Sequence, residues 1–119
     1  MANPFGKRVR WQREALLSLD PLFGLRQIAA KIGVQPSYLS KVERGLVPPP
    51  SENTIVRLAK ALALDPDELL GLACKIPYDV RQTMLKRPRL FAALVRQFTR
   101  VSDDGITRVI LRARRTGRQ

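Results

Sequence analysis

The sequence predicts an all-α protein, and three features of the chain support that fold class. Apolar residues recur every three or four positions, which is the period of an amphipathic helix, and no stretch alternates as a half-buried strand does. Proline and glycine, as in Pro48-Pro49-Pro50, separate the periodic stretches. Ser51 and Asp65, which are good N-caps, stand where such a stretch begins. We therefore expect helices joined by short connections.

Five helices are expected in the first part of the chain, at about residues 4–17, 25–32, 36–44, 51–63 and 66–71. Gly33 and Gly45 can adopt the left-handed conformation that ends a helix. Pro36 and Pro66 suit the first position of the helices that they open.

Three further helices are expected at about residues 78–86, 88–99 and from Ser102 to near the end of the chain. Asp103 and Asp104 at the start of the last helix and Arg114 and Arg115 at its end match the helix dipole.

The charge of the chain is strongly basic and unevenly distributed. The 119 residues carry 22 Lys and Arg against 10 Asp and Glu, a net charge of +12. Residues 1–50 contribute +5, residues 51–74 contribute −2, and residues 75–119 contribute +9. Such an excess indicates a polyanionic partner, with nucleic acid as the leading candidate.

Several classes of site are excluded or disfavoured by composition. The absence of histidine excludes a His-ligated metal and a His-based triad. Cys74, the single cysteine, can form neither an internal disulfide nor a metal cluster, and we expect it to be a small buried residue. We find no Gly-rich phosphate loop, and Asp103-Asp104 reads as a helix start. We therefore expect no metal, no cofactor and no enzymatic activity.

The location of the protein is predicted from three further features. Residues 1–4 lack the pattern of a secretory signal, and no apolar run is long enough to span a membrane. A single unpaired cysteine fits a reducing compartment. We expect a cytoplasmic protein without a membrane partner.

The most informative stretch is Leu25–Gly45, LRQIAAKIGVQPSYLSKVERG, in which two short helices meet at Gly33. With the proline-rich loop before Ser51 and the run RLAKALALDPDELL, it resembles the Cro-type, lambda-repressor-like (XRE) helix-turn-helix transcriptional regulators. The resemblance covers roughly residues 5–71. It implies a five-helix lambda-repressor-like DNA-binding domain at residues 1–74, followed by a C-terminal helical segment at residues 75–119 that carries a basic tail.

The resemblance also implies which helix contacts DNA. In helix-turn-helix domains the second helix of the pair lies in the major groove, and its first residues reach base edges. Here that helix is about residues 36–44. The implied DNA-binding residues are Gln35, Ser37, Tyr38, Ser40, Lys41 and Arg44, with Arg26 on the preceding helix. The alternative interpretation is that this polar face is only solvated.

Two departures from the family pattern affect phosphate binding. Leu25 stands where family members often carry a glutamine, and residues 46–50 contain no Lys or Arg. Arg26, Lys41, Arg44 and the basic C-terminal segment would then supply the phosphate contacts.

Residues of the first helix complete the expected domain. Family members commonly join an arginine of this helix to a glutamate near the end of the recognition helix, and Arg13 and Glu43 match these positions. Trp11 lies off the inward stripe, so we predict that it packs against Leu22 or Phe23. The alternative is an exposed Trp11 on the DNA side.

The C-terminal segment is rich in apolar residues that a five-helix domain does not need. They include Leu90, Phe91, Leu94, Phe98, Ile106, Val109 and Ile110. They either extend the same core or bury against a second copy, and we favour dimerisation because two-fold dimers suit palindromic operators. The Arg-rich end is either a solvated tail or a source of phosphate contacts.

These observations predict a sequence-specific, double-stranded-DNA-binding transcriptional regulator. We expect a homodimeric repressor on an inverted-repeat operator. The alternative is an antitoxin-type protein that binds a toxin through its C-terminal segment and regulates its own gene through the helix-turn-helix.

Overall fold

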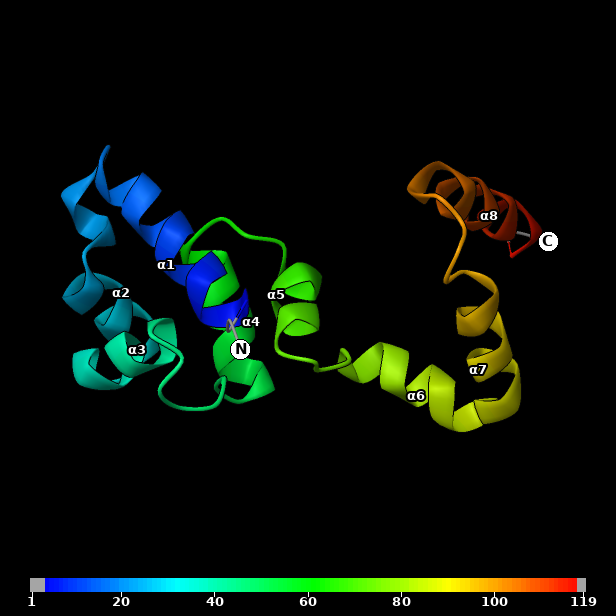
Figure 1. The fold of residues 1–119 in the computed structure, drawn as a ribbon, viewed down its shortest axis with the longest axis horizontal. Helices are drawn as coiled ribbons and strands as arrows, with labels where there is room; N and C mark the ends of the chain where they lie inside the picture. Colours follow the sequence, from blue (N-terminus) through cyan, green and yellow to red (C-terminus); the bar gives the residue numbers. More distant parts are fainter. Residues whose placement is uncertain (1–3, 118–119) are drawn as a thin grey trace. The chain divides into compact units, whose positions relative to one another are not determined.

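The computed structural model describes residues 4–117, and the regular secondary structure of that part of the chain is all helical (Figure 1). The elements in order are α1 (Pro4–Leu17), the short 3₁₀ helix η1 (Pro21–Phe23), α2 (Leu25–Ile32), α3 (Pro36–Glu43), α4 (Glu52–Ala61), α5 (Pro66–Leu72), α6 (Tyr78–Lys86), α7 (Pro88–Gln97) and α8 (Asp103–Thr116). No strand occurs between residues 4 and 117. The predicted all-α class is therefore confirmed. The last two residues of the predicted basic tail lie outside the described residues.

The chain forms two compact units, which we describe separately. The first comprises residues 1–77 and the second residues 78–119. The boundary at residue 74 expected from the sequence falls in the segment that follows α5, still within the first unit.

A single hydrophobic core organises the first unit. Each of its five α-helices turns one apolar face inward, with buried residues at the three- and four-residue spacing of an amphipathic helix. The largest fully buried side chains are Phe5, Val9, Ile28, Ile32, Leu39, Val42, Ile55, Leu58, Leu62 and Leu69. Helices α2, α3 and α4 thus have their orientation set by burial of apolar surface.

Helix ends in the first unit use the caps that the sequence predicts. Asp65 Oδ1 accepts hydrogen bonds from the backbone N–H groups of Asp67 at 2.7 Å and Glu68 at 3.3 Å. Ser51 caps α4 and accepts from the N–H of Thr54 at 3.5 Å. These bonds satisfy N–H groups that a helix leaves without a partner in its first turn.

The expectation that Cys74 is buried is wrong. Its side chain is exposed, and its backbone has a φ of +57°, in the left-handed region. Cys74 lies in the turn that follows α5, where the Lys75 N–H donates a hydrogen bond to the Leu70 carbonyl at 2.9 Å. A position that reverses the chain direction at a helix end lies at the surface.

The second unit consists of α6, α7 and α8. None of its described residues is buried or belongs to the hydrophobic core described above. Leu90 is 70% exposed, and Leu94 and Val95 are each 51% exposed. The apolar faces of α7 and α8 are therefore largely uncovered in the single chain. None of the helices described between residues 4 and 117 is both long and apolar enough to cross a membrane.

Candidate nucleic-acid interface

The turn between α2 and α3 is short because Gly33 reverses the chain. Gly33 has a φ of +79°, and the N–H of Val34 bonds the Ala29 carbonyl at 2.9 Å. A residue with a side chain is strained at this φ, so glycine is favoured here. Pro36 then begins α3 after an extended Gln35. The two helices pack together through their inward faces and form a helix-turn-helix pair (Figure 1).

The outer face of α3 presents a row of polar and basic side chains. Ser37, Lys41 and Arg44 follow one another at helical spacing on the side opposite Leu39 and Val42, and all three are exposed. The Nε of Arg44 donates to the Ser40 carbonyl at 3.3 Å, which holds the arginine along the helix. This row is the part of the predicted site that the structure brings together most clearly.

The remaining residues predicted to contact DNA lie near this row and differ in how far they are buried. Gln35 is exposed just before the first turn of α3, and Ser40 is half-buried. Tyr38 is half-buried and packs against the core, so only part of its ring faces solvent. Arg26 is exposed on α2.

Leu25, which replaces a glutamine common in the family, has a packing role in this chain. It lies at the start of α2, half-buried, and packs against the hydrophobic core. The apolar side chain of Leu25 has no group that binds a phosphate. Near the start of α2, the exposed basic residue that could do so is Arg26.

A buried ion pair joins α1 to the end of α3. Arg13 Nε lies 2.7 Å from Glu43 Oε2, and its second nitrogen, Nη2, donates to Oε1 at 2.9 Å. Both side chains are buried. Hydrogen bonding to Glu43 raises the pKa of Arg13 above its ordinary value, so the guanidinium stays charged. The structure thus brings together the two residues expected to pair.

Gly6 is a structural residue that the sequence analysis did not single out. A Cβ at this position would lie 2.5 Å from the Val42 carbonyl oxygen and 2.7 Å from that of Glu43. Helix α1 therefore approaches the backbone of α3 more closely than any side chain would allow. The available signal was a glycine inside an otherwise helical stretch, which often marks close packing.

The prediction that Trp11 packs against Leu22 or Phe23 is wrong. Trp11 is 73% exposed and lines a shallow hollow with Lys7, Arg10, Glu14, Glu43 and Arg44. Phe23 instead packs against the core, while Leu22 remains 68% exposed. The Phe23 carbonyl accepts from Arg13 Nη1 at 3.4 Å, so η1 is held on the inner side of α1.

Comparison with known proteins agrees with this geometry. The family model described as a helix-turn-helix domain matches residues 4–72, more than half of the chain. The chain belongs to the helix-turn-helix family, of the Cro-type kind. The match covers every helix of the first unit of this helix-turn-helix protein, including α2 and α3. Neither a curated protein nor a solved structure matches the chain.

The acidic residues of this helix-turn-helix protein do not assemble into a metal site. Within residues 4–117, no group of three or more His, Cys, Asp or Glu side chains lies close enough together to hold an ion.

Membership of the family indicates a DNA-binding regulator.

Proposed function

We propose that this helix-turn-helix protein is a sequence-specific regulator that reads double-stranded DNA with α3. The observation that carries the proposal is the exposed row Ser37, Lys41 and Arg44 on a helix whose opposite face is buried. A major groove about 12 Å wide accepts one α-helix. The Arg13–Glu43 ion pair holds that helix against α1, which fixes the direction in which the row projects.

The residues of the row differ in what they can bind. Gln35 and Ser37 stand at the start of α3, where short polar side chains reach base edges. Lys41 lies one turn further along the exposed face and can donate to the O6 and N7 acceptors of guanine. Arg44 and Arg26 suit phosphate oxygens, because both are exposed cations beside the helix pair. Tyr38 and Ser40 contribute at the edges of the contact.

We further propose that the second unit makes the regulator a homodimer. Leu90, Leu94, Val109 and Ile110 are between 44% and 70% exposed, although they lie on the apolar faces of α7 and α8. Exposed apolar faces of this kind mark interaction sites. The same faces carry Phe91, Phe98 and Ile106, which are half-buried. A two-fold dimer would place two α3 helices on an inverted repeat, where a bound protein blocks transcription.

The same uncovered faces support a second candidate, an antitoxin-type protein. In that case a toxin, rather than a second copy, covers the apolar side of α7 and α8, and DNA binding regulates the pair of genes. The mass of the purified chain in solution separates the two. A dimer that Leu94→Glu converts to a monomer supports self-association, whereas a monomeric wild type favours the antitoxin.

Selection from a pool of random DNA duplexes tests the proposal. The purified protein at near-physiological salt should enrich an inverted repeat with half-sites about 10–11 base pairs apart, or a multiple of that spacing. Enrichment of a single half-site would support base reading by α3 and contradict binding as a homodimer. Salt-sensitive binding without any enrichment would contradict sequence-specific reading, because charge alone gives non-specific affinity.

A further inference from the structure

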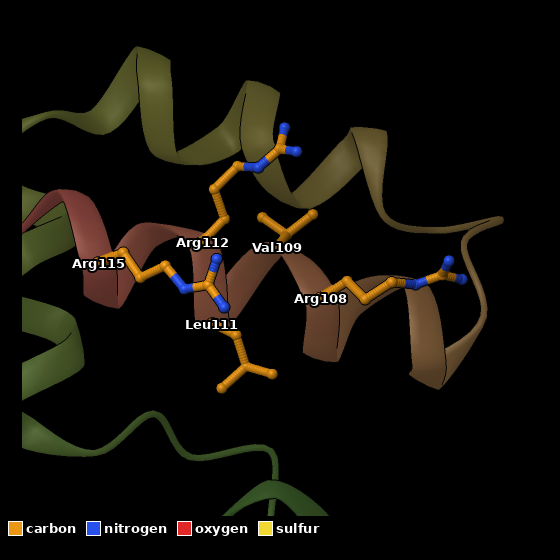
Figure 2. A pocket seen from close by; sticks show the side chains of 5 residues that line it. All are labelled: Arg108, Val109, Leu111, Arg112 and Arg115. Carbon is orange, nitrogen blue, oxygen red and sulfur yellow. The ribbon is translucent and has the colours of Figure 1, made fainter.

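Three of the four arginines of helix α8 form a row along one face. Arg108, Arg112 and Arg115 are spaced by four and three residues, so successive side chains lie one turn apart. All three are exposed, and with Val109 and Leu111 they line a hollow formed by α8 (Figure 2). At about 1.5 Å of rise per residue, the row extends roughly 10 Å along the helix.

The arginine row is separate from the apolar side of the same helix. Ile106 and Ile110 recur at helical spacing on the other side, whereas Val109 and Leu111 flank the row and line the same hollow (Figure 2). A partner that covers Ile106 and Ile110 therefore leaves the arginines accessible. The two sides can serve two different contacts at once.

Neither helix stability nor ion pairing explains the row. Like charges three and four residues apart repel each other on a helix. The helix dipole favours cations in the last turn, but Arg108 lies in the second turn of a helix that begins at Asp103. Among the described residues, no carboxylate lies within ion-pair distance of Arg108, Arg112 or Arg115. The Arg108 Nε instead donates to the backbone carbonyl of Asp104 at 3.4 Å.

We propose that this arginine row is a second, sequence-independent DNA-binding surface that contacts phosphates of the duplex. Double-stranded DNA carries about one negative charge per 1.7 Å of its axis, so a row of this length meets several phosphates. Guanidinium groups bind phosphate oxygens through paired N–H donors. The inference rests on the proposed function because it takes double-stranded DNA as the partner, but it does not require base reading by α3.

The test is the salt dependence of DNA binding by the full chain. Arg108→Gln/Arg112→Gln/Arg115→Gln removes the row, and Arg87→Gln/Arg89→Gln/Arg96→Gln removes equal charge from other exposed sites of the same unit. Each released phosphate contact changes the slope of log affinity against log salt by about 0.9. The row variant should lose up to about 2.7 from the slope for each bound chain on any duplex, and the control variant much less. Lysine at the three row positions should restore most of the slope.

Four outcomes would overturn the proposal. An unchanged slope in the row variant excludes the contact, and equal losses in both variants assign the effect to overall charge. Binding of the row to anionic lipid vesicles with no effect on DNA identifies a membrane surface instead. A different result is a wild type that binds duplexes without sequence preference while the row variant still has a reduced salt-dependence slope. That result contradicts base reading by α3 and supports DNA binding by the arginine row. If the wild type binds no DNA, both proposals fail.

Discussion

Arg13 and Glu43 form a two-point ion pair between α1 and the last turn of α3, with Nε–Oε2 and Nη2–Oε1 distances of 2.7 and 2.9 Å. Both residues are buried, with 6% and 7% of their surface exposed. The attraction inside the protein offsets the loss of water around the two charges only while both partners are present. The pair therefore couples the position of the proposed reading helix to the first helix.

Glu43→Ala should lower the free energy of unfolding by about 3–5 kcal/mol, because it leaves Arg13 buried without its partner. Urea unfolding measures the change. The double variant Arg13→Met/Glu43→Leu removes both charges and should recover most of that loss. A single variant within about 1 kcal/mol of the wild type would show that the pair does not organise the α1–α3 contact.

Gly6→Ala should destabilise the protein by about 1–3 kcal/mol, although alanine is the better helix former. Its Cβ would meet the Val42 and Glu43 carbonyl oxygens at 2.5 and 2.7 Å, so α1 must move away from α3. Gly71→Ala in α5 is the matched control, because nothing lies within 4 Å of a Cβ there. Thermal unfolding should show a stabilisation of up to about 1 kcal/mol for the control. Equal effects of the two substitutions would contradict a close approach of α1 to the α3 backbone at Gly6.

The sequence predicted the helices of this chain well, because their boundaries depend on local chemistry. The Asp65 cap, the prolines at the starts of helices and the left-handed Gly33 act within one turn of their own positions. Leu39 and Val42, which are three residues apart on α3, are both buried, as helical periodicity requires. Periodicity reports which side of a helix is buried, and that information is sufficient for the inward faces.

The misplaced residues depend on contacts that spacing does not contain. Trp11 lies outside the inward stripe of α1, and only the docking of η1 decides whether anything covers it. Gly6 has meaning only once α1 and α3 are placed against each other. For the candidate site, the sequence named the residues of the exposed α3 row, and the resemblance supplied their role. Which atoms contact DNA depends on the duplex as well as on the protein.

Ala63→Gly should stabilise the protein by about 0.5–1 kcal/mol. Ala63 follows α4 with a φ of +56°, a conformation that glycine adopts without the steric penalty of a Cβ. Its side chain is exposed, so the change removes no core packing. Ala30→Gly, at an exposed position inside α2, is the control and should destabilise by about 1 kcal/mol in the same denaturant titration. A loss of stability in both variants would contradict strain at Ala63.

Glu14→Gln should reduce stability near pH 7 and have less effect near pH 3. The hydrogen bond from Arg10 Nε to Glu14 Oε1, at 2.9 Å, lowers the pKa of Glu14 below its ordinary value of 4.5. A carboxylate with a lowered folded pKa contributes stability above its ordinary pKa, and this contribution is lost as the pH falls through the folded value. Denaturant unfolding of both proteins across this range measures the difference. A difference that grows on acidification would contradict the assigned direction.

The central claim, that α3 reads bases, is tested most directly by the affinities of Lys41→Ala for a selected duplex and for a scrambled one. Lysine contacts to guanine contribute about 1–3 kcal/mol of discrimination, so the preference for the selected duplex should fall roughly 5- to 150-fold. Binding to the scrambled duplex should change little, and Lys60→Ala, at an exposed lysine on α4, should leave the preference intact. Equal weakening on both duplexes, or no weakening on either, would contradict base reading by Lys41 on α3.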